Sequence, residues 1–141
     1  MSKNWVQDIA LMHNQYGVKE WMHDNENNTD KMREYLHFRV KFLREELMET
    51  EAALTHNDAE EIVDGLIDLC VVAIGTLDAF GVDPYKAWDE VLKANLSKEV
   101  GVKPERPNPL GLPDLIKPEG WESPSHEGNH GKLNNLSLIH I

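Results

Sequence analysis

Residues 61–80, EIVDGLIDLCVVAIGTLDAF, are the stretch that decides the fold. Apolar residues recur in it every three or four positions, which is the spacing of one face of an α-helix. Gly81 follows as a natural C-terminal stop. Asn57 is the predicted N-cap, and Glu60 three residues later completes a capping-box pattern. The inward face of this helix is predicted to carry Ile62, Leu66, Leu69, Ala73, Leu77 and Phe80.

Three more helices are predicted, two before this one in the sequence and one after it. Asp83-Pro84 suits a helix start, because Asp caps well and Pro fits the first turn. Residues 21–30 are rich in Asn and are predicted to be a polar connector. No strand-like alternation occurs before Gly101, so the predicted class is all-α with a four-helix bundle-type core. The additional helices are expected at about residues 4–16, 30–55 and 84–98.

Beyond Val102 the composition changes. Six of the seven prolines lie between Pro104 and Pro124, so regular elements are not expected there. Apolar residues between these prolines favour an arm that packs on the body or on a neighbouring subunit over low-complexity disorder. We therefore predict an all-α domain at residues 1–101 and an irregular, Pro-rich C-terminal arm at residues 102–141.

The composition restricts the partners of this chain. A net charge of −11 argues against nucleic acid, because few cations are available to neutralise a run of phosphates. The sequence contains no signal peptide and no apolar stretch of membrane-spanning length, so no membrane partner and a cytoplasmic location are expected. The one cysteine, Cys70, lies in an apolar run and is predicted to be a core residue.

Two groups of carboxylates lie on consecutive predicted helices, eleven residues apart. Glu46 and Glu49 project from one face of the first helix. Glu61, Asp64 and Asp68 follow at i, i+3 and i+7 on one face of the second. If the two faces meet, several acidic oxygens crowd into a small volume, where they repel one another unless cations lie between them. Oxygen ligands of this kind suit Mg²⁺, for which Mn²⁺ is expected to substitute.

A solvated acidic face is the alternative for the first helix, since charge runs are usually exposed. The second helix favours a shared site, because Asp64 and Asp68 interrupt an otherwise apolar segment and acids facing a packed interior are costly unless paired or metal-bound. A di-iron bundle is a weaker competitor. It needs two Glu-x-x-His motifs, and only Glu34-x-x-His37 matches.

Basic and amide groups are expected to complete a phosphate site. Asn95 and Lys98 lie at the end of the last predicted helix, and Arg39 lies seven residues before Glu46, hence on the same helical face. For Lys98 the alternative is an ordinary basic residue that the helix dipole favours near a C-terminus.

Together these motifs resemble the all-α nucleoside triphosphate pyrophosphohydrolases, a group that includes MazG-like proteins, dimeric dUTPases and phosphoribosyl-ATP pyrophosphohydrolases. The signature of the group is Glu-Glu-x-x-Glu, a spacer, then Glu-x-x-Asp, present here as Glu45-Glu46-x-x-Glu49 and Glu61-x-x-Asp64. The spacer is short for the group. Residues 12–18, the Asn95-Leu96-Ser97-Lys98 ending and Lys117-Pro118-Glu119-Gly120-Trp121 are similar to the small phage and bacterial MazG-like branch.

The resemblance implies cleavage of a nucleoside triphosphate between its α- and β-phosphates, which releases a nucleoside monophosphate and pyrophosphate. It assigns Glu45 to the attacking water. It also implies a homodimer or homotetramer whose four-helix core forms across subunits. The implied Mg²⁺ ligands are Glu46, Glu49, Glu61 and Asp64, with Asp68 as a further ligand or supporting group. The implied phosphate-binding residues are Asn95, Lys98 and Arg39.

The base that the site reads is left open by these motifs. His13 and Trp21 are candidates to contact it, as are Trp5 and Trp121, although Trp5 also suits packing of the first helix and Trp121 anchoring of the tail. The branch resemblance favours a purine deoxynucleotide such as dGTP. The alternatives are a phosphoribosyl-ATP pyrophosphohydrolase, which shares the acidic motifs, and a non-enzymatic helical interaction module with solvated acids.

Overall fold

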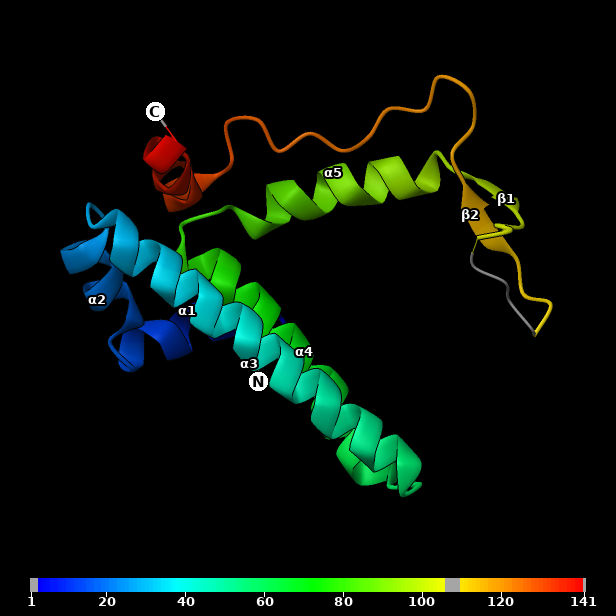
Figure 1. Ribbon diagram of the computed structural model, residues 1–141, viewed down its shortest axis with the longest axis horizontal. Coiled ribbons are helices and arrows are strands. Elements are labelled where there is room, and N and C mark those ends of the chain that lie inside the picture. The colour runs from blue at the N-terminus through cyan, green and yellow to red at the C-terminus, as the bar shows by residue number, and fades with distance from the viewer. Residues whose placement is uncertain (1–2, 106–109, 141) are drawn as a thin grey trace. The chain divides into compact units, whose positions relative to one another are not determined.

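The computed structural model describes residues 3–105 and 110–140, and it confirms the all-α class (Figure 1). Within those residues, helices account for most of the chain, and the strands form one short antiparallel ribbon. The α-helices are α1 (Trp5–Gln15), α2 (Val18–Asn25), α3 (Thr29–Thr55), α4 (Ala59–Ala79) and α5 (Pro84–Leu96). The other elements are β1 (Glu99–Gly101), β2 (Asp114–Ile116) and the 3-10 helix η1 (Gly131–His140).

The chain forms two compact units. The first combines Met1–Pro84 with His130–Ile141, and the second is Tyr85–Asn129. The predicted domain boundary between residues 101 and 102 stays a prediction.

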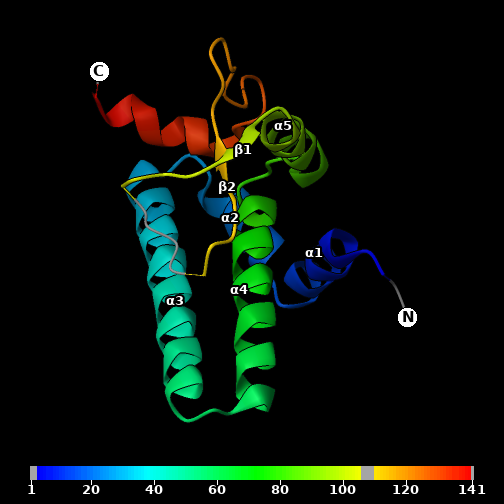
Figure 2. The same cartoon turned by 90° about the vertical axis from the view of Figure 1, so that its right-hand side faces the viewer.

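The antiparallel pair of α3 and α4 is the largest feature of the first unit, and α1 packs on α4 (Figure 2). Gly65 lets the two long helices approach closely, because a Cβ there would overlap the Thr50 hydroxyl group. Thr50 Oγ1 in turn donates a hydrogen bond to the Glu46 carbonyl oxygen at 2.8 Å. The faces of α3 and α4 that carry the predicted acidic residues therefore meet.

The turn between α3 and α4 corrects one predicted cap. The N-cap of α4 is Asp58, whose side chain accepts a hydrogen bond from the Glu61 backbone N–H at 3.2 Å. Asn57 instead adopts a left-handed conformation with φ 54°, which Asn tolerates better than most residues. Asp and Asn are both good caps, so sequence alone did not decide between adjacent positions.

A second correction concerns the predicted connector at residues 21–30, where the structure has the end of helix α2. Gly17, with φ 79°, separates α1 from α2. Met22, one turn after Val18, is buried and anchors α2 to the core. The polar composition of this segment concealed a two-turn helix that tertiary packing holds in place.

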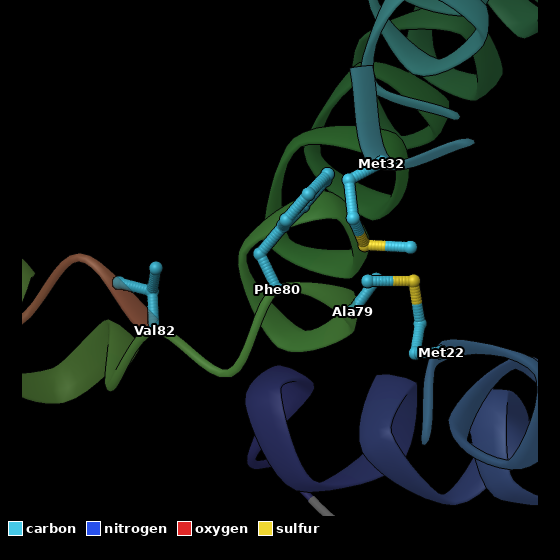
Figure 3. Packing of buried hydrophobic residues seen from close by; sticks show 5 residues of the cluster. All are labelled: Met22, Met32, Ala79, Phe80 and Val82. Atoms are coloured by element: carbon cyan, nitrogen blue, oxygen red, sulfur yellow. The ribbon is translucent and has the colours of Figure 1, made fainter. Parts of the chain in front are cut away.

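The core of the first unit gathers where the ends of α2, α3 and α4 meet. Met22 and Met32 direct their side chains toward Ala79 and Phe80 at the end of α4 (Figure 3). Phe80, Met22 and Met32 are the largest fully buried side chains among the described residues. Methionine suits this junction because its flexible thioether fills irregular gaps. The buried residues of this cluster are Met22, Met32, Ala79, Phe80 and Val82.

A strand and a 3-10 helix form beyond Val102, where the many prolines had led us to expect no regular elements. Strand β2 lies between two prolines, and η1 returns to the first unit. The Lys132 N–H donates to the Phe80 carbonyl oxygen at 2.7 Å, and Leu133 and Leu136 pack against the core. Gly131 leaves space for this approach, because a Cβ there would overlap the Phe80 carbonyl oxygen.

The outer face of α4 is more apolar than expected. Cys70, predicted to be buried, is exposed, and Leu66 of the predicted inward face is 53% exposed. Among the described residues, no single helix is long and apolar enough to cross a membrane. One bent pair of helices, Ala59–Ala79 with Pro84–Leu96, meets the criteria of length and composition when the two are taken together.

Candidate active site

Glu46 is the centre of an acidic cluster between α3 and α4. Burial raises the pKa of its carboxyl group above the ordinary value. A hydrogen bond with Asp68 raises this pKa as well. Carboxylates from both helices therefore lie close enough to act on one another. The neighbouring charges that raise the pKa further are, from the largest effect, those of Glu49, Asp68 and Asp64.

One carboxylate oxygen in this cluster has no partner. Glu46 Oε2 is buried and accepts no hydrogen bond from the described part of the protein. A buried acceptor without a partner is uncommon, since it loses its hydration without compensation. A hard cation would satisfy this oxygen and offset the repulsion around it, so the donor set fits Mg²⁺. Within residues 3–105 and 110–140, however, no three acidic, His or Cys side chains converge closely enough to hold a metal ion, so a bound ion requires some side chains to turn.

Two of the predicted acidic residues lie at the margin of this cluster. Glu61 is exposed in the first turn of α4, one turn before Asp64. Glu45 is exposed on α3 and lines a hollow of about 310 Å³ together with Phe38, Lys41 and Phe42. Their predicted roles in metal binding and in water activation stay predictions.

Arg39 and His13 belong to a polar cluster that begins two helical turns from Glu46. Arg39 is buried; its Nε donates to Thr76 Oγ1 and its Nη2 to the Val72 carbonyl oxygen, both at 3.0 Å. His13 is also buried, and its Nδ1 lies 3.1 Å from Asp78 Oδ2. These bonds join α1 and α3 to α4 and leave the predicted substrate contacts of both residues untested.

Gly75 of α4 lies against the Arg39 and His13 side chains of this polar cluster. A Cβ at residue 75 would lie 2.8 Å from both Arg39 Nη2 and His13 Nε2, so only glycine leaves room for both side chains. Burial lowers the pKa of His13, and the Arg39 charge lowers it further, whereas Asp78 opposes the shift. Thr76 and Asp78 were not among the predicted site residues. Their spacing from the predicted acids on α4 was the available signal.

Two aromatic ring pairs include residues of α3, the helix that carries Glu45, Glu46 and Glu49. Trp21, a predicted base contact, packs on Tyr35 with ring centroids 5.3 Å apart and is 38% exposed. Phe38 and Phe42, which were not predicted as site residues, form an adjacent ring pair with centroids 6.4 Å apart. Phe38 is 60% exposed and lies two turns before Glu45 on α3. It is the better exposed ring on the helix that carries the acids.

Asn95 and Lys98 belong to the second unit. Asn95 is exposed in the last turn of α5, and the Lys98 N–H donates to its carbonyl oxygen at 3.2 Å. The Lys98 amino group lies over the Trp121 ring, 5.3 Å from its centroid. Trp121, which follows the last predicted helix in the sequence, thus contacts the amino group of Lys98, the residue predicted to bind phosphate.

The fold and this site define an all-α protein in which two antiparallel helices set Glu and Asp side chains against one another. A family model for phosphoribosyl-ATP pyrophosphohydrolase (PRA-PH) matches residues 15–95, which carry every predicted acidic ligand. The chain belongs to this family, which is part of the all-α nucleoside triphosphate pyrophosphohydrolase superfamily, and the resemblance to that superfamily is confirmed. No curated protein sequence gives a significant match. The MazG-like branch stays a prediction.

Proposed function

We propose that this pyrophosphohydrolase family member is Mg²⁺-dependent and converts a nucleoside triphosphate and water into a nucleoside monophosphate and pyrophosphate. The observation that carries the proposal is the crowding of Glu49, Asp64 and Asp68 around Glu46, whose buried Oε2 has no hydrogen-bond partner among the described residues. A polyphosphate is an anion, so the carboxylates of this cluster would repel it. Binding of the polyphosphate therefore needs a cation between its phosphates and the carboxylates. The substrate class we favour is a purine deoxynucleotide such as dGTP, on the branch resemblance.

Glu46, Glu49, Asp64 and Asp68 would hold the metal, with Glu61 one turn away on α4. Bound Mg²⁺ would neutralise phosphate charge and lower the pKa of a coordinated water. Glu45, exposed beside this group, would orient and deprotonate the attacking water. The hydrogen bonds of Arg39 to α4 would keep the two acid-bearing helices in register.

The Phe38–Phe42 pair would supply the surface on which the base stacks. Its hollow of about 310 Å³ is close to the lower limit, about 300 Å³, for small-molecule sites. Glu45 lines the same hollow, so the proposed base surface adjoins the proposed water-activating residue.

Phosphoribosyl-ATP is the second candidate substrate, because the matching family model is that of phosphoribosyl-ATP pyrophosphohydrolase. The two candidates share the bond that is cleaved and the pyrophosphate that is released. The two substrates differ in the group attached to the base, which the acidic cluster does not contact when it binds the phosphates. A comparison of turnover with each substrate therefore distinguishes the two candidates.

The test is a screen of all common NTPs and dNTPs, together with phosphoribosyl-ATP, at fixed Mg²⁺ or Mn²⁺, with products identified by ion-exchange chromatography. Monophosphate plus pyrophosphate from one purine deoxynucleotide supports the leading proposal. Preferential turnover of phosphoribosyl-ATP selects the second candidate. No turnover of any compound, without metal-induced stabilisation, supports an interaction module and overturns both.

A further inference from the structure

The β ribbon of the second unit brings two lysines together. Strand β1 pairs antiparallel with β2, with Glu99 opposite Ile116. Lys98 and Lys117 are the next residues along the two strands, so they continue this register as an opposed pair. Like charges placed opposite one another on paired strands are destabilising. The ribbon thus holds two cations where its own stability gives no reason for them.

Trp121 gathers both of these amino groups. The Lys98 Nζ lies 5.3 Å from the Trp121 ring centroid and the Lys117 Nζ 5.1 Å from it. The indole N–H donates to the Ala94 carbonyl oxygen at 2.8 Å, which fixes the ring against α5. Cation–π attraction offsets part of the repulsion, but an aromatic ring carries no net charge that could neutralise two cations.

In the part of the chain that the structure describes, no acidic partner completes this arrangement. Within the described residues, neither lysine has a carboxylate oxygen within 4.0 Å of its amino group. A neighbouring hollow of about 510 Å³ is lined by Trp121, by one amino group, that of Lys93, and by three carboxylates, those of Glu90, Glu119 and Glu122. Those carboxylates disfavour phosphate inside the hollow, so an anion would bind at the lysines rather than there.

We propose that Lys117 and Lys98 form a paired phosphate site held by Trp121, and that Lys117 is a further substrate-binding residue. The proposal rests on the proposed function, in which the substrate is a polyphosphate. Two amino groups on one ring match a chain of phosphates, because each can neutralise a different phosphate of the same ligand. Lys117 would bind substrate through its charge without taking part in the chemistry.

The direct test is calorimetric binding of inorganic tripolyphosphate to the full-length protein in Mg²⁺, for the wild type, Lys117→Ala, Lys117→Arg and Lys86→Ala. Lys86, in the first turn of α5, gives a matched loss of charge away from the ribbon. Lys117→Ala should weaken binding about tenfold or more, since hydrogen bonds to charged groups are among the stronger ones. Lys117→Arg should retain most of the affinity, and Lys86→Ala should bind as the wild type does. The salt dependence of binding should become shallower only in Lys117→Ala.

Equal tripolyphosphate affinity and salt dependence in wild type and Lys117→Ala overturn the paired site. An equal loss in Lys117→Ala and Lys86→Ala also overturns it, because it indicates a general effect of net charge. In turnover of the nucleotide selected by the screen, Lys117→Ala should raise KM and leave kcat nearly unchanged. Tripolyphosphate binding without turnover of any nucleotide would contradict the proposed function and leave the lysine site standing, so the two failures are distinguishable.

Discussion

Glu46 links the acidic cluster to the stability of the protein. Its pKa is raised in the folded state, mainly by burial, so the native protein holds this proton more tightly than the unfolded chain does. The free energy of unfolding therefore falls as the pH rises from the ordinary value of 4.5 to the raised native value, and it stays lowered above that. In metal-free protein at pH 7, Glu46→Gln should raise Tm. The gain should vanish below pH 4.5, where Glu46 is protonated in both states.

Thermal unfolding in EDTA at pH 4 and pH 7 measures this effect. Glu45→Gln is the matched control, because it removes one charge at the adjacent exposed position of α3. A Tm of Glu46→Gln at or below that of the wild type at pH 7 would contradict the crowding of charges around Glu46.

The carboxylates of Glu49 and Asp64 are predicted to be required for turnover. Glu49→Gln and Asp64→Asn preserve side-chain size and remove one anionic ligand each, from α3 and from α4. We expect kcat/KM to fall by about 10² to 10³ or more, comparable to the loss of other groups that stabilise transition-state charge. A pyrophosphate-release assay measures this, with circular dichroism to confirm folding and Glu51→Gln as an exposed acidic control on α3. Near-normal turnover by both variants, with unchanged metal dependence, would refute the site assignment.

The spacing between α3 and α4 is set at Gly65. Replacing Gly by Ala inside an exposed helix ordinarily stabilises it by about 0.5–1 kcal/mol. Here the added Cβ would overlap the Thr50 hydroxyl group, so Gly65→Ala should instead destabilise the protein by about 1–3 kcal/mol, the typical cost of overpacking. Because Thr50 is one turn from Glu46, activity should fall as well.

A double-mutant cycle with Thr50→Ala tests this cause by urea denaturation. Removing the Thr50 hydroxyl group should make room for the new methyl group, so the double variant should be more stable than the sum of the single effects predicts. Additive effects, or a stabilising Gly65→Ala, would show that the helices are not in contact at this point.

The joint between α1 and α4 should respond to pH through His13. Its pKa is lowered in the folded state, chiefly by burial, so the native protein holds this proton less tightly than the unfolded chain. Stability should therefore decrease as the pH falls from 6.5 toward the lowered native pKa. His13→Asn should flatten this part of the pH profile, as measured by urea denaturation between pH 5 and pH 8. His37→Asn on the exposed side of α3 is the control, and an equally steep profile in His13→Asn would contradict the prediction.

Helical periodicity predicted the elements whose apolar residues are spaced regularly, and it failed where packing from distant residues decides the structure. Helix α4 was predicted nearly in full, because one sequence segment contains both its apolar face and its Gly81 stop. Helix α2 was missed because it depends on the contact of Met22 with the end of α4. Cys70 was assigned to the core because an apolar run does not show which of its faces is covered.

The candidate site divides in the same way. The spacing of Glu46, Glu49, Asp64 and Asp68 predicted acidic residues on facing helices, and the structure brings these four together. The partners of Arg39 and His13 were not predicted, because Thr76 and Asp78 are more than thirty residues away along the chain. The opposition of Lys98 and Lys117 depends on the pairing of two three-residue strands, which are too short to show an alternating pattern.

At the scale of the whole molecule, the exposed apolar face of α4 is the surface that favours a protein partner. The face is opposite the one that meets α3 and includes Val63, which is 63% exposed, with Leu66, Ile67 and Cys70 beside it. A contiguous apolar surface of this kind usually marks a protein interface. The family resemblance implies a helical core completed by a second copy, so we predict that this face of α4 forms the contact of a homodimer or homotetramer.

Light scattering coupled to size-exclusion chromatography measures the expected assembly, and Leu66→Lys should lower its mass. A lysine there would have to bury its charge in the contact, which is costly without an acidic partner. Leu112→Lys, at a position of the second unit that is 60% exposed against 53% for Leu66, is the matched control and should leave the mass unchanged. If the wild type is a monomer at high concentration, or if Leu66→Lys retains the wild-type mass, the α4 face is not the contact. A loss of assembly with unchanged kcat would show that each copy carries a complete site, whereas a parallel loss of turnover would show that the core of the site forms between copies.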